Sequence, residues 1–455
     1  MLFSFEYFIT VPDCLSVGSR RISLGKRAER DTRYLVYLLK SEKSSLRYPD
    51  WLCAGAIVSP TYILTSASCI RDVGFLYAIA GYRKYVRSEN LNLDKCTRER
   101  KQKVIRTCYP KKNTFTHQIL TEWLYLDIGF AIVEKPYNFT DLTYRFYCSY
   151  VPAPIKINLD PKYVVNGTNA MVYGWGHQIL NRQPGNTQDF NQEYLHSVRT
   201  RIVPKTVCNS AYTSPNLTNI IMENMICCQG DGLLDENGNP DYIDPVLADG
   251  RSRRKNTENF TDDFIKSAND KNIYNETNKF FYTRKQGICQ NDHGAPLVTW
   301  IGKEEYVLGV ASTSLIKKKS HCSPPYLYTS AQCTSRFIKC ALLGYGGKPV
   351  RRMCDNLEKE EGYAIHETKI DWAQMDGNEE NNTNLPRYKT KLDDDGSEIF
   401  KFNPDDWDNE TDINDFFKQD ARTGEDSKDE FSSSSKPGLA YKLNFDSVTD
   451  DVIII

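Results

Sequence analysis

The sequence lacks any apolar run of about 18 or more residues, the length that a membrane-spanning helix requires. Its six histidines are not spaced with acidic residues or cysteines as metal ligands would be, so we expect no metal site and no cofactor. Aromatic residues are not interleaved with basic ones in the pattern of nucleic-acid-binding domains, which argues against a nucleic-acid partner.

The first 21 residues lack the basic start and the unbroken apolar core of a secretory signal, because Glu6 interrupts a short apolar stretch. We interpret residues 1–21 as a degenerate signal or propeptide. Fourteen cysteines nevertheless indicate an oxidising, extracellular compartment in which disulfides persist. Seven Asn-x-Ser/Thr sequons agree with a secreted glycoprotein. They lie at Asn138, Asn166, Asn216, Asn259, Asn275, Asn381 and Asn409.

The net charge of -1 conceals an uneven distribution of charge along the chain. From residue 376 onward there are 21 acidic and 9 basic residues. Residues 346–455 bury too little apolar surface to offset chain entropy, so we expect a mostly disordered acidic tail. Basic residues gather at 83–112 and at Lys317–Lys319. These clusters favour either an anionic partner, such as a sulfated glycan or the chain's own tail, or ordinary solvated loops.

Short β-type runs separated by turn residues dominate residues 34–330, which is typical of an all-β sandwich or barrel. Residues 335–343 are expected to form a short closing helix, and the GYGGKP that follows marks a domain boundary. Residues 229–285 are polar and rich in turn residues, which predicts a long insertion. Within it, RSRR at 251–254 provides a candidate cleavage site at Arg254–Lys255.

Several motifs resemble those of trypsin- and chymotrypsin-like serine proteases and follow one another in that family's order. CQNDHGAPLV at 289–298 resembles C-x-G-D-S-G-G-P, the segment that carries the nucleophilic serine. The other motifs are RISLG (21–25), AGAIVSPTYILTSASC (54–69), YLDIGFAIVEKP (125–136), MVYGWG (171–176), ENMICC (223–228), GVASTS (309–314) and PPYLYTS (324–330). The resemblance implies a domain at residues 22–345 built of two six-stranded antiparallel β-barrels, with the site in the cleft between them.

The resemblance places the three catalytic positions at Ser68, Asp127 and His293. Only the aspartate keeps its family identity, because Ser68 replaces the general base and His293 replaces the nucleophilic serine. A serine hydroxyl cannot act as a general base near neutral pH, and losing nucleophile or base alone costs on the order of 10⁶ in turnover in a protease of related mechanism. The two residues look exchanged, but Asp127 would then lie beside the serine and could not orient the histidine. We therefore expect no catalysis.

The oxyanion loop departs from the family's pattern as well. Asn291 replaces a glycine, and asparagine is the side-chain-bearing residue that best tolerates a left-handed backbone. Asp292 and Gly294 are retained, while Ala295 replaces another glycine. In the family, the aspartate at position 292 pairs with a new N-terminus, which cleavage at Arg21–Ile22 would supply here.

The substrate-binding positions are altered too. The base of the specificity pocket maps to Gly287, which is uncharged, and the family's tryptophan beside the substrate strand maps to Thr313. Ser312, Thr313 and Ser314 would line the substrate strand. An extended peptide could pair with this strand through main-chain hydrogen bonds without being cut.

The resemblance also implies disulfide pairs. These are Cys53–Cys69, Cys208–Cys227, Cys289–Cys322 and Cys14–Cys148, with Cys96–Cys108 as an additional local bridge. Four cysteines remain, and the three ways of pairing them cannot be ranked from sequence. They are Cys228, Cys333, Cys340 and Cys354.

These observations favour a secreted, non-catalytic protease homologue that acts as a cofactor, decoy or adaptor for another extracellular protein, such as a protease, an inhibitor or a zymogen. Two alternatives stay open. One is an endopeptidase with residual or unconventional activity, and the other is a self-associating extracellular structural component.

Overall fold

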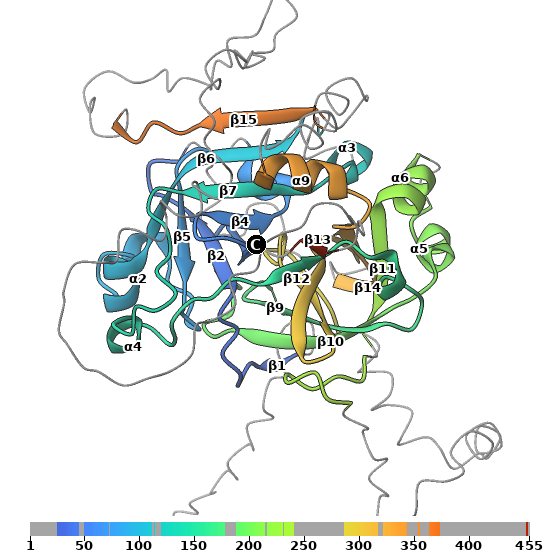
Figure 1. Ribbon diagram of the computed structural model, residues 1–455, viewed down its shortest axis with the longest axis horizontal. Coiled ribbons are helices and arrows are strands. Elements are labelled where there is room, and N and C mark those ends of the chain that lie inside the picture. Colours follow the sequence, from blue (N-terminus) through green and yellow to red (C-terminus); the bar gives the residue numbers. More distant parts are fainter. Residues whose placement is uncertain are drawn as a thin grey trace, which may run out of the picture.

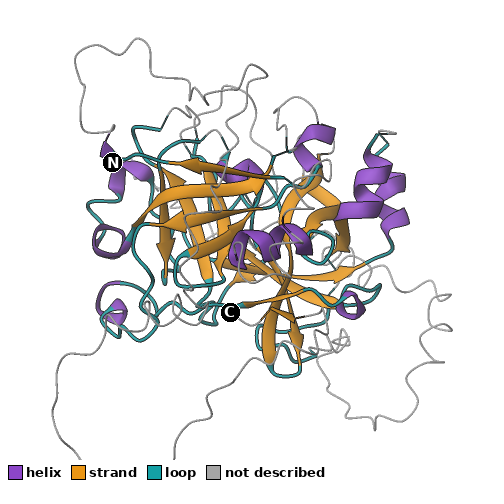
Figure 2. Cartoon of the chain, turned by 45° about the horizontal axis from the view of Figure 1, so that its top comes forward, coloured by secondary structure: helices purple, strands orange, loops and turns teal. Residues whose placement is uncertain are grey.

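The computed structural model describes residues 25–44, 50–71, 73–111, 113, 120–177, 188–213, 216–230, 232–240, 286–316, 322–343, 354, 364–373 and 452–453. The longer strands among these residues form two closed antiparallel β-barrels that pack side by side, with short helices around them (Figure 1, Figure 2). The two-barrel fold predicted from the sequence is therefore confirmed.

The first barrel closes in the order β2–β3–β4–β7–β6–β5 and back to β2. Its strands are β2 (Leu35–Lys40), β3 (Leu52–Ile57), β4 (Tyr62–Thr65), β5 (Leu76–Ala80), β6 (Gln102–Pro110) and β7 (Gly129–Val133). Strand β2 is buried along its whole length because alternate side chains enter two different cores. Val36 and Leu38 belong to one core cluster, whereas Tyr37 packs edge-to-face on Trp175 of the second half.

The second barrel closes in the order β9–β10–β11–β14–β13–β12 and back to β9. Its strands are β9 (Asn169–Gly174), β10 (His196–Ile202), β11 (Met225–Gln229), β12 (Pro296–Ile301), β13 (Glu304–Ile316) and β14 (Cys322–Ser330). Three strands precede the predicted insertion and three follow it. The barrel therefore closes only when both parts of the chain come together.

Shorter elements surround the barrels. Strand β1 (Lys26–Arg27) pairs with β10, β8 (Lys156–Asn158) runs parallel to β13, and β16 (Val452–Ile453) pairs with β8. The helices are α1 (Ala67–Ile70), α2 (Lys95–Arg100), α3 (Leu120–Leu124), α4 (Tyr144–Tyr147), α5 (Lys205–Ala211), α6 (Leu217–Asn224) and α9 (Ser335–Leu343), with 3-10 turns η1 (Ser88–Asn90) and η2 (Pro161–Tyr163). Helix α9 lies where the sequence predicted it. In the described part of the chain, no helix combines the length and apolar character needed to cross a bilayer.

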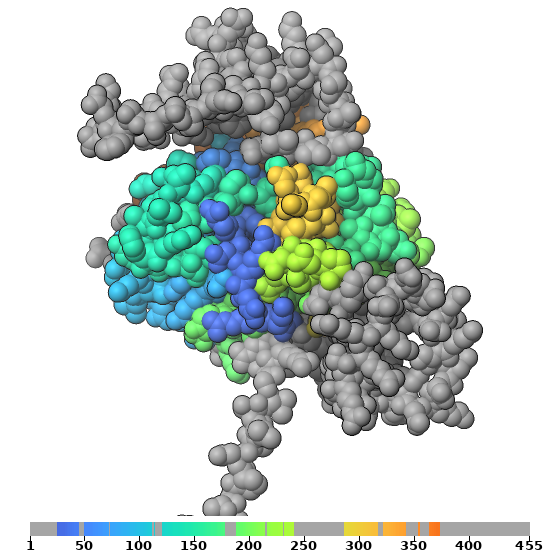
Figure 3. Space-filling view, turned by 60° about the horizontal axis from the view of Figure 1, so that its bottom comes forward, coloured from blue at the N-terminus to red at the C-terminus, as the bar shows by residue number. Residues whose placement is uncertain are grey.

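The first residues of the predicted insertion are folded, which corrects its boundary at 229. Gln229 still belongs to β11, and Glu236 is only 5% exposed. The Glu236 carboxylate accepts hydrogen bonds from the backbone N–H groups of Glu29 and Arg30, at 2.9 and 2.8 Å. Figure 3 shows the yellow-green segment 232–240 against the blue N-terminal residues. A buried carboxylate with these donors ties the segment to the domain, so the insertion proper begins after residue 240.

The predicted disordered tail also contains a folded segment, which we call the C-terminal strap and define as residues 364–373. Strand β15 (Ile365–Lys369) pairs antiparallel with β6, and it lies along β6 at the edge of the first barrel (Figure 1). Trp372 is only 6% exposed. Disorder from residue 346 onward is therefore wrong for the strap, because its alternate apolar side chains pack against the barrel. It is also wrong for Cys354, which is buried and bonded to Cys340, and for Val452–Ile453, which pair with β8. The remaining residues from 374 to 451 lie outside the described part.

The disulfides confirm three of the predicted pairs, Cys53–Cys69, Cys208–Cys227 and Cys289–Cys322. Two predicted pairs are wrong. Cys148 bonds to Cys96 and not to Cys14, and the Cys96–Cys148 disulfide joins α2 to the end of α4. Cys108 is a free thiol buried in the first barrel's core, so nearness in sequence misled the prediction of Cys96–Cys108. Cys340 pairs with Cys354, while Cys228 and Cys333 are free thiols.

Candidate functional site

The structure brings Ser68 and Asp127 together. Ser68 lies in the short helix α1 after β4, and Asp127 lies in the connection before β7. The Ser68 backbone N–H donates to Asp127 Oδ1 at 2.8 Å, and the Ser68 hydroxyl lies 3.3 Å from Oδ2. Ser312 Oγ donates to the same Oδ2 at 2.5 Å. Two hydroxyl groups thus surround a carboxylate that in the family orients a histidine.

The Asp127 carboxyl group is fully buried. Burial raises its pKa to about 6, although the hydrogen bonds from Ser312 and Ser68 act in the opposite direction. Hydroxyl donors stabilise the carboxylate less than a positive charge would. Asp127 consequently lies in a site where its charged form costs free energy.

His293 precedes β12, and its side chain is only partly exposed. Its Nδ1 lies 2.7 Å from the main-chain oxygen of Ser312, and its ring centroid is 5.2 Å from that of Trp123. A carbonyl oxygen can only accept, so Nδ1 must carry the proton and donate it. Burial lowers the pKa of His293 to about 4, so the ring is neutral near pH 7.

The hydrogen bonds of the described residues do not join Ser68 to His293. The Ser68 hydroxyl contacts Asp127 and the Ser66 hydroxyl, which is 2.9 Å away, whereas His293 is bound to Ser312. Asp127 thus orients a serine, as the exchanged arrangement predicts. Activation of a hydroxyl nucleophile requires a hydrogen bond to its base, and neither serine nor histidine has this arrangement here.

The predicted oxyanion loop has a left-handed backbone at position 291, where asparagine replaces the family's glycine. Asn291 has a φ of 70°, in the left-handed region that asparagine was predicted to tolerate, and Gly294 has a φ of 77°. The Asn291 side-chain amide donates to the Asp50 carbonyl at 2.9 Å and to Asn191 at 2.7 Å. The Gly294 N–H donates to the Ala311 carbonyl at 2.8 Å. These bonds hold the loop rigidly to its neighbours.

Asp292 is a second deeply buried carboxyl group, with 1% of its surface exposed. It accepts hydrogen bonds from the backbone N–H groups of Gly176 at 2.8 Å and Cys289 at 3.0 Å. Burial raises its pKa to about 7, against these two bonds. The expected partner at Ile22, and the cleavage site before it, lie outside the described residues.

The predicted base of the specificity pocket, Gly287, lies against a residue that the sequence analysis did not single out. Tyr326 on β14 is fully buried, and a Cβ atom placed on Gly287 would lie 2.0 Å from its ring. The phenyl ring therefore packs directly against the predicted pocket base. The substrate strand is affected too, because the Ser312 carbonyl is already taken by His293, while Thr313 and Ser314 pair with β14 on their other side.

One comparison with known proteins supports this fold. The family model described as Trypsin matches residues 23–239. This part of the chain is a trypsin-like domain, in agreement with the two barrels. A search of curated proteins gives no match to it. The trypsin-like fold extends beyond the matched range, since β12, β13 and β14 complete the second barrel. Members of the matched family are serine endopeptidases, and Ser68 and His293 are the positions where this chain differs from the resemblance set out above.

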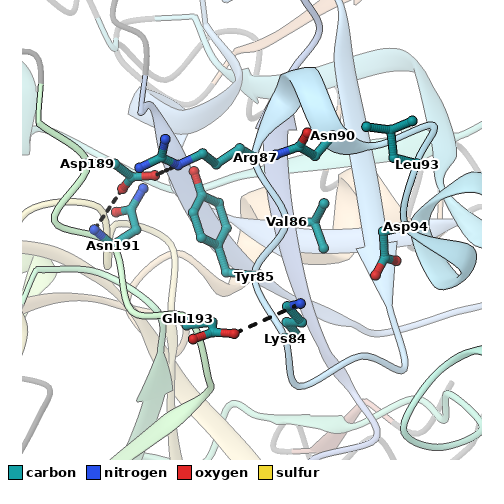
Figure 4. A pocket seen from close by; sticks show the side chains of 10 residues that line it. All are labelled: Lys84, Tyr85, Val86, Arg87, Asn90, Leu93, Asp94, Asp189, Asn191 and Glu193. Atoms are coloured by element: carbon teal, nitrogen blue, oxygen red, sulfur yellow. Dashed lines mark hydrogen bonds and ion pairs between the residues drawn. The ribbon is translucent and has the colours of Figure 1, made fainter.

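A surface hollow of about 470 Å³ lies on this trypsin-like domain, and none of the three catalytic positions lines it. It is formed where residues 84–94 meet residues 189–193, and Figure 4 shows the Tyr85 ring beside the Arg87–Asp189 ion pair. The Arg87 Nε donates to Asp189 at 2.7 Å, and Lys84 lies 3.9 Å from Glu193. Several basic residues of the 83–112 cluster are thus paired with acids. Lys317–Lys319 lie outside the described residues.

Only some of the predicted modification sites lie among the described residues. Asn138, Asn166 and Asn216 are exposed on the domain, where a glycosyl transfer enzyme could reach them. The other four sequons and the Arg254–Lys255 site lie outside the described residues. Within the described residues there is no cluster of three or more His, Cys, Asp or Glu side chains that could hold a metal ion.

Proposed function

We propose that this trypsin-like chain is a non-catalytic protease homologue that binds another extracellular protein, acting as a cofactor, decoy or adaptor. The observation that carries the proposal is that each of the two exchanged residues, Ser68 and His293, is hydrogen-bonded to a different partner among the described residues. Ser68 is held by Asp127, and His293 is held by the Ser312 carbonyl. A site with no paired nucleophile and base has no route to an acyl intermediate.

Two further features support binding over cutting. Tyr326 fills the place where a substrate side chain would enter, and His293 occupies the carbonyl that an extended peptide would need. We favour a protein partner over a sulfated glycan because several basic side chains between residues 83 and 112 are ion-paired. Five disulfides and the exposed sequons support secretion.

The test compares the purified wild-type chain with His293→Ala and Ser68→Ala. Each is incubated with a fluorophosphonate probe and, separately, with a fluorogenic denatured protein substrate. We expect neither labelling nor turnover in any of the three. Turnover by the wild type that disappears in His293→Ala would replace this proposal with an unconventional endopeptidase.

A binding experiment complements the activity assay. The full chain and a chain ending at residue 373, which keeps the strap, are immobilised and used for capture from the native extracellular fluid. We expect the same protein on both, because both barrels and the strap are present in both and the shorter chain loses only the two-residue strand β16 from the described part. Capture that requires residues 374–455 would assign the binding function to the tail instead.

A further inference from the structure

The C-terminal strap lies on an edge of β6 that no other described strand covers. Residues Arg106–Cys108 of β6 pair with β7 on one side, and β5 pairs only with Gln102 and Lys103. Strand β15 takes the other side, from Ile365 opposite Pro110 to Lys369 opposite Arg106. Without the strap, this stretch of β6 would present unpaired backbone groups, which is the usual template for adding a strand.

A slot for one indole ring continues this edge. The Trp372 Nε1–H donates to the Val104 carbonyl at 2.8 Å, and its ring centroid lies 5.1 Å from Phe75 and 5.0 Å from Tyr77. The Lys103 ammonium lies 5.2 Å from the centre of the indole. A tryptophan satisfies both the hydrogen bond and the aromatic contacts, so the slot is selective for this side chain.

The side chains of the strap alternate between inward and outward positions, as those of an extended peptide ligand do. Ile370 and Trp372 are buried at 7% and 6% exposure, while Glu367 and Lys369 point to solvent. His366, on the inward side, packs on Tyr109 with ring centroids 4.9 Å apart. Glu367 adds an exposed ion pair with Arg106 at 3.7 Å. The pattern of two apolar anchors on an extended backbone matches recognition by strand addition.

We propose that the edge of β6 and the Trp372 slot together form a strand-docking groove that recognises the segment 364–373, in cis within one chain and in trans from a second copy. The cis strap keeps the groove filled because its tether gives it an effective concentration in the millimolar range. A second copy's strap can enter once the cis strap leaves. This inference concerns the first barrel's outer edge, and it does not depend on whether the cleft is catalytic.

The test uses full-length chains and a fluorescent peptide of residues 362–375. Trp372→Ala and Thr368→Pro each weaken the cis strap and leave every groove residue unchanged, since Pro removes an N–H from the strand and Ala removes the anchor. We expect the peptide to bind both variants at least about 10-fold more tightly than it binds the wild type. Glu367→Ala, which removes an outward side chain and its exposed ion pair with Arg106, is the matched control and should bind the peptide within about 3-fold of the wild type.

The peptide itself provides a second control. A peptide carrying W372A should lose about 100-fold or more in affinity, because burial of the indole dominates the contact. Circular dichroism and thermal unfolding establish that each variant chain is folded. Equal binding of the peptide to the variants and the wild type, or equal binding of the tryptophan-free peptide, would overturn the proposal. So would failure of the peptide to bind the folded variants.

Discussion

Replacing Asp127 with asparagine should stabilise the protein at neutral and basic pH. The buried carboxyl group has its pKa raised from 3.8 to about 6. Each pKa unit corresponds to about 1.4 kcal/mol, so the ionised carboxylate costs the folded state about 3 kcal/mol once the pH exceeds 7. The asparagine carbonyl can keep the Ser68 N–H bond. Its amide can donate to the Ser68 and Ser312 hydroxyls, which rotate to accept.

The difference in the free energy of unfolding between Asp127→Asn and the wild type should depend on pH. Below about pH 3 the carboxyl group is protonated in both states, so the wild type and Asp127→Asn should be equally stable. Between about pH 3 and 6 the unfolded chain ionises first, and the wild type loses stability as the pH rises. The advantage of the variant should therefore grow from about 0.6 kcal/mol at pH 4 to about 3 kcal/mol at pH 8.

The measurement is denaturant unfolding followed by circular dichroism at pH 4, 6 and 8 with the disulfides intact. Asp141→Asn serves as the control, because the Thr143 hydroxyl and Arg100 lower the pKa of Asp141. That variant should lose stability at pH 8, in the opposite direction. A pH-independent difference for Asp127→Asn, or destabilisation at pH 8, would refute the account of a carboxylate whose charged form is destabilised by burial.

Three other outcomes follow from the same geometry. The double variant Ser68→His with His293→Ser should remain inactive toward peptide substrates in a fluorogenic assay, because Tyr326 still fills the predicted pocket. Adding Tyr326→Gly to this variant should create a cavity that binds small aromatic molecules, as measured by calorimetry. Iodoacetamide should alkylate Cys333 in the native protein, as read by mass spectrometry, but spare the two fully buried free thiols, whose pKa values burial raises. Trp372→Ala should cost about 3–5 kcal/mol in urea unfolding, whereas alanine at an outward strap position should change stability by less than about 0.5 kcal/mol.

The order of motifs was sufficient to predict both barrels and the meeting of Ser68 with Asp127, and the residue pattern of 335–343 predicted the closing helix. Conformational reasoning also predicted the left-handed backbone of Asn291, because few residue types can replace glycine there. Each of these follows from local chemistry or from a motif whose spacing is preserved in the chain.

The errors arise where distance along the chain says little about distance in space. Cys96 is closer in sequence to Cys108 than to Cys148, but β6 directs Cys108 into the core and the end of α4 brings Cys148 to α2. The strap was missed because composition was averaged over an acidic tail, although HETKIDW alternates inward and outward side chains. Tyr326 had a visible sign, because PPYLYTS resembles the family's P-G-V-Y-T with a tyrosine in place of the glycine, but its consequence depends on Gly287 facing it.

The second barrel has a consequence for proteolytic processing. Its strands β9–β11 come from one side of residues 241–285, and β12–β14 come from the other. Every disulfide among the described residues joins cysteines on the same side of that stretch. A nick at Arg254 would therefore leave two fragments held together by strand pairing and shared core packing, without any of these disulfides crossing between them. They should migrate as one species on a native gel and separate in detergent without any reducing agent.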